Sequence, residues 1–187
     1  MRPTERIIQA QRVLEAEARA IFASSQKINL NFSKCVDLII DCKGTVVISG
    51  IGKSGNIGRK ITSTLASLGT PSIFLHTSDA FHGDLGILRR DDLLICISNS
   101  GETDELIRLL NYAKRNNIKS IAITGNINST ISKEASISLN SSVESEACPL
   151  NLAPTCSTSV TMALGDALAS ICAMERGFKE IDFARFH

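Results

Sequence analysis

The chain has 187 residues, of which 43% are hydrophobic and 21% are charged, and its formal net charge is +1. This length is enough for one domain with a buried core, and the composition is that of an ordinary globular protein. A charge so close to zero gives no support for nucleic acid or an anionic membrane as a partner, and we expect no apolar run to reach the roughly 18 residues of a membrane span.

The first twenty residues, MRPTERIIQAQRVLEAEARA, are polar and contain acids, unlike a secretory signal peptide. The six cysteines form no CxxC pair, so their spacing favours neither a zinc site nor a disulfide framework. We therefore expect free thiols and a cytoplasmic protein.

Two helices are predicted first, at residues 5–25 and 30–42, because apolar side chains recur in both at helical spacing. Five short runs rich in β-branched residues follow. They are nearly continuous rather than alternating, as expected of parallel strands covered on both faces. These runs occupy residues 45–51, 72–76, 92–98, 119–124 and, more weakly, 135–140.

Helix-length patterns separate the strands, at residues 55–68, 103–116 and 128–135. Alternating strands and helices predict an α/β fold, a three-layer sandwich in which helices flank a five-stranded parallel sheet. The last pattern, at 157–175, is apolar on nearly all sides, so we expect it to be buried in the molecule or against another subunit.

The connection SGIGKSGNIG, residues 49–58, follows the first predicted strand. Its glycines match the G-x-G-x-x-G spacing of dinucleotide sites, although such a match alone is weak. The acid expected after the second strand is missing, since His76 comes first and Asp79 only later, and Lys53 among the glycines does not fit a Walker loop. A dinucleotide site and a purely structural turn remain open alternatives.

The connection SNSGET, residues 98–103, ends the third predicted strand and opens a helix. Hydroxyls and backbone N–H groups around a glycine at a helix start form a cradle suited to a phosphate monoester. A plain Ser/Thr helix cap remains the alternative and would explain any one hydroxyl, but three hydroxyls together, with Ser54 on the neighbouring connection, favour the cradle. The predicted phosphate-binding residues are Ser54, Ser98, Asn99, Ser100 and Thr103.

Acids follow this cradle at Glu102, Asp104 and Glu105. They suit the helix dipole but would repel a phosphate. At least one of them must therefore point away or take part in chemistry.

The motifs GIGKSG and SNSGET together resemble the sugar isomerase (SIS) domain, whose members bind phosphosugars. Three further stretches, FHGDLG (81–86), EACPLNLAPTCST (146–158) and GFKEIDFARFH (177–187), resemble arabinose-5-phosphate isomerases. The resemblance covers nearly the whole chain. It implies a flavodoxin-like or Rossmann-like fold and a single SIS domain over residues 1–187, without the cystathionine-β-synthase modules of many relatives and without their continuation after the final histidine.

This resemblance implies an isomerase that interconverts D-ribulose 5-phosphate and D-arabinose 5-phosphate through an enediol, supplying Kdo for lipopolysaccharide or capsule. Such a reaction needs a base and stabilised oxyanion charge, but no redox cofactor and no metal. Isomerases of heptose or hexulose phosphates and a non-catalytic phosphosugar sensor remain alternatives.

The resemblance also assigns residue roles. Glu146 is expected to be the base that moves the C1/C2 proton, with apolar neighbours that raise its pKa, although it could be an ordinary surface acid. Lys53 is expected to stabilise enediolate or phosphate charge and to pair with Glu105. His82, or His187 from a neighbouring subunit, is expected to open the sugar ring or polarise the carbonyl. The expected substrate-loop glycines are Gly50, Gly52 and Gly83.

The expected partners are the phosphosugar and other copies of the chain, as a homotetramer. A speculative end-product inhibitor is CMP-Kdo, whose acid and phosphate groups would use the same cradle at the active site. No nucleic acid is expected, because the chain has neither a separate helix-turn-helix domain nor a basic patch, and no membrane is expected.

Overall fold

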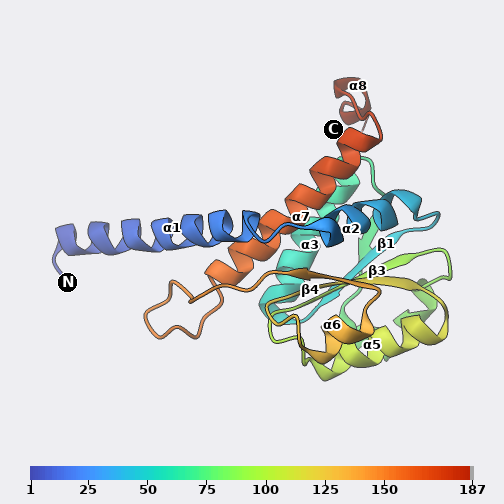
Figure 1. Ribbon diagram of the computed structural model, residues 1–187, viewed down its shortest axis with the longest axis horizontal. Helices are drawn as coiled ribbons and strands as arrows, with labels where there is room; N and C mark the ends of the chain where they lie inside the picture. The colour runs from blue at the N-terminus through green and yellow to red at the C-terminus, as the bar shows by residue number, and fades with distance from the viewer. Residues whose placement is uncertain (186–187) are drawn as a thin grey trace.

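Five parallel strands form one sheet in the order β2-β1-β3-β4-β5 in the computed structural model, which describes residues 1–185 (Figure 1). The strands are β1 (Val46–Gly50), β2 (Ser72–Phe74), β3 (Leu93–Ser98), β4 (Lys119–Thr124) and β5 (Ile137–Asn140). This is the flavodoxin-like order of a doubly wound sheet, in which the strand sequence reverses direction between β1 and β3. The predicted five-stranded parallel sheet is confirmed.

Helices cover both faces of this sheet. One face packs against α2 (Leu30–Asp41), α3 (Gly52–Ser67) and α7 (Cys156–Glu175), and the other packs against α5 (Asp104–Arg115) and α6 (Thr130–Glu134). Shorter elements are α4 (Thr77–Ala80), the 3-10 turn η1 (Asp84–Ile87) and α8 (Glu180–Phe183).

Every residue of β1 and β3 is buried, which explains why the sequences of these strands are continuous apolar runs. Successive side chains of a strand point to opposite faces. Ile48 and Ile95 accordingly pack in the cluster that contains Leu164 of α7, whereas Val47 and Leu94 join a separate cluster under α5. The core therefore has two layers, one on each side of the sheet.

Among the helices of residues 1–185, α7 alone has the length and composition of a membrane-spanning helix, and 56% of that stretch is buried inside the molecule. Polar residues such as Asp166 interrupt this stretch, so α7 resembles a membrane span by its mean hydropathy and not as an uninterrupted apolar run. The absence of a membrane-spanning helix stays a prediction. The helix packs against α3, α1 and α2, as a core helix does.

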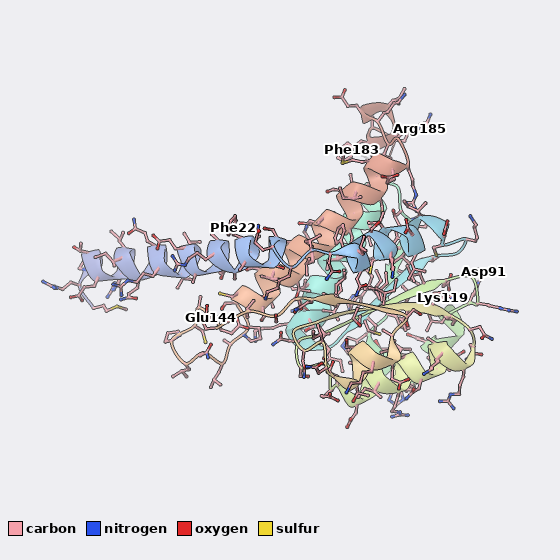
Figure 2. The ribbon with its side chains drawn as sticks, viewed as in Figure 1. Phe22, Asp91, Lys119, Glu144, Phe183 and Arg185 are labelled. Atoms are coloured by element: carbon pink, nitrogen blue, oxygen red, sulfur yellow. The ribbon has the colours of Figure 1, made fainter. Side chains whose placement is uncertain are left out.

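The first helix, α1 (Pro3–Ser25), projects from the sandwich and contacts α7 (Figure 1). Ser159 of α7 donates a hydrogen bond to the Glu17 carboxylate at 2.7 Å and anchors the helix. Its large apolar side chains are largely exposed in the described structure: Leu14 is 69% exposed, and Phe22, labelled in Figure 2, is 70% exposed. The predicted amphipathic helix is present, and its apolar face is open.

Candidate functional site

The connection from β1 to α3 is much shorter than the predicted loop, because the strand ends at Gly50 and the helix already begins at Gly52. Gly52 has a φ of 58°, in the left-handed region that glycine adopts readily. A Cβ on Gly55 would lie 2.7 Å from the carbonyl oxygen of Gly50, so strand and helix meet backbone to backbone. Lys53 and Ser54 consequently lie in the first turn of α3.

The SNSGET turn contains hydroxyls of two kinds. Ser98 is 4% exposed, and its oxygen accepts the N–H of Gly101 at 3.0 Å and lies 2.9 Å from the Thr103 hydroxyl. Asn99 and Ser100 are exposed at the mouth of the turn. Thr103 precedes α5, but its side chain does not cap the helix. Helix capping therefore does not explain the Thr103 hydroxyl. Ser98 stabilises the turn through its hydrogen bonds to Gly101 and Thr103.

A small cavity joins these two turns to the start of α7. Ser54 and Asn99 meet there with Ser157, so the structure brings together two of the predicted phosphate-binding residues. The remaining lining residues are Ile57, Pro154, Thr158 and Thr161. The hydroxyls of α7 were missed in the sequence, where the CSTSVT run at 156–161 was interpreted as the start of an apolar helix.

Glu146 lies in the connection between β5 and α7, and its carboxylate caps that helix. Oε2 accepts the N–H of Thr155 at 2.8 Å, the hydroxyl of Thr155 at 3.0 Å and the N–H of Ser157 at 3.1 Å. Oε1 accepts the hydroxyl of Ser157. These donors stand at the N-terminus of a 20-residue helix, where a negative charge is favoured.

The predicted rise in the pKa of Glu146 is wrong. Burial acts to raise this pKa, but the hydrogen bonds from Ser157 and Thr155 to the charged form together outweigh burial and hold the pKa below its ordinary value of 4.5. Of the neighbours expected to shield Glu146, Pro149 is exposed, and Ala147 and Cys148 are only half-buried.

The loop that carries Glu146 is ordered by its own polar groups. The N–H of Glu146 donates to Asn151 Oδ1 at 2.6 Å, and the N–H of Ala147 donates to Thr155 Oγ1 at 2.8 Å. The sulfur of Cys148 accepts two further backbone N–H groups from the same loop. Glu146 is thus held from its backbone as well as from its carboxylate.

Lys53 and Glu105 do not form the predicted ion pair: neither belongs to an ion pair within residues 1–185. Lys53 is exposed on α3, and Glu105 stands in the first turn of α5, where the helix dipole favours an acid without a cationic partner. Glu102 is the acid that turns away, since its carboxylate accepts the N–H of Thr130 at 2.9 Å.

Of the two predicted histidines, only His82 lies within the described residues. His82 is exposed on the turn after α4, where its N–H donates to the carbonyl of Asp79 at 2.9 Å and Gly83 follows with a φ of 125°. His187 lies outside the described residues. A third histidine, His76, stands where a dinucleotide site would have an acid, and the sequence gives it no other role. Its Nδ1 atom is buried without a hydrogen-bond partner in the described structure.

All six cysteines are free thiols, as predicted. Within residues 1–185, no group of three or more His, Cys, Asp or Glu side chains is arranged to hold a metal ion. The independence of the reaction from metals stays a prediction.

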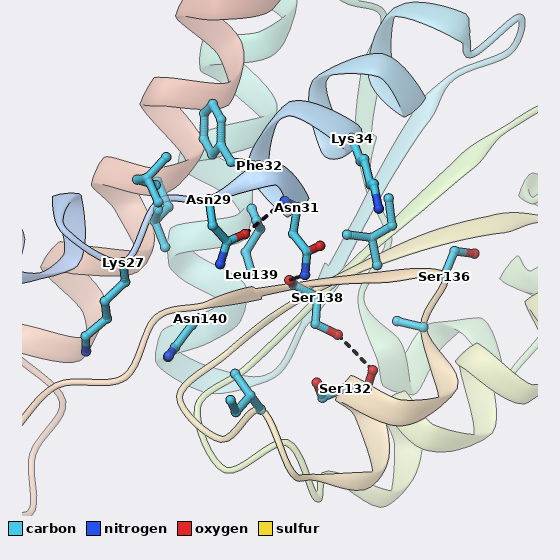
Figure 3. A pocket seen from close by; sticks show the side chains of 15 residues that line it. Lys27, Asn29, Asn31, Phe32, Lys34, Ser132, Ser136, Ser138, Leu139 and Asn140 are labelled. Carbon is cyan, nitrogen blue, oxygen red and sulfur yellow. Dashed lines mark hydrogen bonds between the residues drawn. The ribbon is translucent and has the colours of Figure 1, made fainter.

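A wider groove lies along the edge strand β5, between α2 and α6 (Figure 3). Lys27 and Lys34 stand along it, and Asn31 donates to the Ser138 carbonyl at 3.4 Å across it. None of the predicted site residues that the structure describes lines this groove. Ligands of such sheets bind at the carboxyl ends of the strands, so the candidate site is the cavity at Ser54, Asn99 and Ser157.

Known proteins match this chain along most of its length. The family model described as SIS domain matches residues 38–171. A "probable arabinose 5-phosphate isomerase" of Haemophilus influenzae is 50% identical over 178 residues, which cover 95% of this chain and 53% of that protein. The "arabinose 5-phosphate isomerase KpsF" of Escherichia coli is 50% identical over 177 residues, which cover 95% of this chain and 56% of that protein.

The chain therefore spans about half the length of the curated relatives it matches. A solved structure from E. coli CFT073, described as a complex with arabinose 5-phosphate, has a TM-score of 0.96 and 37% identity, and the match covers 100% of both chains.

Proposed function

Because this chain belongs to the SIS domain family, we propose that it interconverts D-ribulose 5-phosphate and D-arabinose 5-phosphate. The observation that carries the proposal is the cavity where Ser54 and Asn99 meet Ser157, the residue whose hydroxyl binds the Glu146 carboxylate. Ser157 thereby connects this cavity to the Glu146 carboxylate, and an aldose–ketose isomerase needs both a phosphate site and a base. Relatives named for this reaction, and a neighbour of matching length in complex with arabinose 5-phosphate, support the choice of substrate.

The phosphate binds at the ends of β1 and β3. Ser54 on α3 and the exposed Asn99 and Ser100 offer donors at the mouth, with Thr103 at the start of α5. Ser98 is buried and positions Thr103 through the hydrogen bond between their hydroxyls. The N-termini of α3 and α5 add partial positive charge to this position. Binding energy from the phosphate positions the reacting carbons.

Glu146 moves the proton between C1 and C2 of the open-chain sugar. Lys53, exposed on the first turn of α3, stabilises the enediolate or phosphate charge, and Glu105 stands in the corresponding turn of α5. His82, or His187 of a neighbouring copy, opens the sugar ring. The glycines that shape the substrate loops are Gly50, Gly52 and Gly83.

The product supplies Kdo synthesis for lipopolysaccharide or capsule, and the reaction takes place in the cytoplasm. Relatives named arabinose 5-phosphate isomerase support the pathway, and six free thiols agree with a reducing compartment. Residues 1–187 form one SIS domain that assembles as a homotetramer. The open apolar face of α1, which includes Leu14 and Phe22, supports the assembly.

The direct test is incubation of the protein with ribulose 5-phosphate, hexulose 6-phosphates and heptulose 7-phosphates, with and without EDTA, and identification of the products by NMR. Arabinose 5-phosphate should form fastest, and EDTA should leave its rate unchanged. Faster conversion of a hexulose or heptulose phosphate would assign a different isomerase. Tight binding of the phosphosugars without any product would assign a sensor.

Feedback by CMP-Kdo would act at the same site, because its carboxylate and phosphate groups suit the same cradle. Inhibition should then be competitive with the phosphosugar. Noncompetitive inhibition would place the inhibitor in another part of the molecule, such as the groove of Figure 3.

A further inference from the structure

The two oxygens of the Glu146 carboxylate are not equivalent. Oε2 accepts three hydrogen bonds, two from Thr155 and one from the N–H of Ser157. Oε1 accepts one, from the hydroxyl of Ser157. Each carboxylate oxygen offers about two lone-pair sites, so Oε2 is saturated and Oε1 keeps an open site.

We propose that Oε1 is the atom of Glu146 that receives the substrate proton, and that Ser157 is a positioning residue that holds this atom at the cavity. The proposal rests on the proposed isomerase function. It assigns a role to a side chain that touches the base and not the reacting carbons.

The place of Ser157 in the fold suits this role. Its side chain is on the buried first turn of α7, where it is 3% exposed, and it lines the cavity beside Ser54 and Asn99. A side chain fixed in a packed helix holds a carboxylate more rigidly than a loop residue does. Ser157 therefore links the position of the base to that of the phosphate cradle.

The proton balance of the step is simple. In the aldose-to-ketose direction, the C2–H electron pair forms the C1–C2 double bond of the enediolate, and the proton adds to Oε1, which makes Glu146 a neutral acid. The hydroxyl proton on the C2 oxygen then passes to the C1 oxyanion of the sugar itself. Glu146 returns its proton to C1 as the C2 carbonyl forms, and this restores the carboxylate. Ser157 donates to Oε1 while the carboxylate is charged, so it stabilises the form that accepts the proton.

Ser157 is the side chain that most strongly lowers the pKa of Glu146. The charged and titratable side chains in its own loop and on the elements that pack against the start of α7 include Glu17 and Arg19 on α1, Lys53 on α3, and Glu144 and Cys148 in the loop. None of these is a hydrogen-bond or ion-pair partner of Glu146 in the described part of the chain. The side-chain hydrogen bond from Ser157 is the largest of the effects that lower the pKa of Glu146.

The test compares Ser157→Ala with Ser159→Ala. Ser159 is a matched control because it stands on the same helix and donates to a different carboxylate, that of Glu17. In Ser157→Ala, kcat should fall at least about tenfold while KM stays nearly constant, because substrate binding is retained and the base is misplaced. The acid limb of the kcat profile should move up by about one pH unit, since the carboxylate loses a hydrogen bond that stabilised its charged form. Ser159→Ala should leave kcat and the acid limb of its pH profile unchanged.

A ¹³C NMR titration of the Glu146 carboxyl in both variants provides a readout that does not need activity. An upward shift of its midpoint in Ser157→Ala supports the positioning role, even if the wild-type protein lacks isomerase activity and the proposed function fails. An unmoved midpoint or acid limb, or an equal rate loss in Ser159→Ala, overturns it. If Ser157→Ala does not fold, Ser157→Cys keeps a weaker donor of similar size and should shift the midpoint in the same direction by less.

Discussion

Serine hydroxyls around the candidate site differ in what they contact, and this decides what each can do. Ser98 is buried and bonded within its own turn, whereas Ser100 is exposed at the mouth of that turn, where its hydroxyl accepts the N–H of Glu102 at 3.2 Å. Ser157 is buried against the Glu146 carboxylate. One residue type is thus buried in a turn, exposed at its mouth, and hydrogen-bonded to a carboxylate at three different positions.

Ser100→Ala should weaken phosphosugar binding by about 1–3 kcal/mol, the scale of a hydrogen bond to a charged group. Isothermal titration with arabinose 5-phosphate measures this loss. Ser25→Ala, an exposed serine at the end of α1 whose hydroxyl also bonds to local backbone, is the control and should bind normally. Unchanged affinity in a folded Ser100→Ala protein would place the phosphate elsewhere.

Glu146→Gln keeps the shape of the side chain but removes its basic group. The value of kcat should fall about 10²–10⁴-fold, the usual effect of losing a general base, with little change in phosphate-driven binding. Exchange of the transferred sugar proton in D₂O should fall in step. Glu144→Gln, two residues away and exposed, should leave both rates unchanged. Exchange at the native rate in the Glu146 variant would redirect attention to His82 and Glu105.

At the scale of elements, the site is built from helix starts. The first turns of α3 and α7 contribute Ser54 and Ser157 to one cavity, and α5 begins immediately after the SNSGET turn that exposes Ser100. The approach of α3 to β1 depends on glycine, because a side chain on Gly55 would enter the space of the Gly50 carbonyl. The spacing of the glycines reflects this packing.

Gly55→Ala should lower the free energy of unfolding by about 1–3 kcal/mol, the usual effect of overpacking, because its Cβ would meet a backbone oxygen at 2.7 Å. Urea denaturation followed by circular dichroism measures the change. Gly86→Ala is the control, since a Cβ there meets no atom within 4 Å. Equal stability of the two variants would show that β1 and α3 can separate without loss.

At the scale of the whole molecule, α1 is the feature that one copy of the chain does not explain. It extends from the sandwich (Figure 1). Its large apolar side chains, among them Leu14 and Phe22, are exposed. A helix of this kind gains its stability by packing an apolar face against a partner. A second copy of the chain is the partner that the proposed assembly supplies.

The double variant Leu14→Glu and Phe22→Glu should lower the mass measured by light scattering from that of a tetramer to that of a smaller species, because two charges would enter the apolar face. Gln11→Glu adds one charge at an exposed polar position of the same helix and should leave the mass unchanged. A tetramer that persists in the double variant would assign the interface to another surface.

Local patterns in the sequence determined much of this protein. Nearly continuous runs of β-branched residues predicted all five strands, because a strand buried on both faces is apolar throughout. Helical spacing predicted the principal helices, because burial on one face leaves a helical period in the chain itself. The resemblance to SIS isomerases is likewise carried by local motifs, and a family match over residues 38–171 confirms it. Ser54 and Asn99 could be predicted to meet, since parallel strands end at one edge of the sheet.

Only the tertiary structure decided the environment of Glu146. Its sequence neighbours suggested an apolar shield and a raised pKa, but its actual partners, Thr155 and Ser157, come from the start of α7 and lower the pKa. The expected pairing of Lys53 with Glu105 failed for the same reason. Hydrogen bonds and charge pairs depend on which groups meet in space and on how loops fold back. The apolar pattern of a strand or helix indicates which of its faces are buried. It does not indicate which side chain of another element lies opposite a given face.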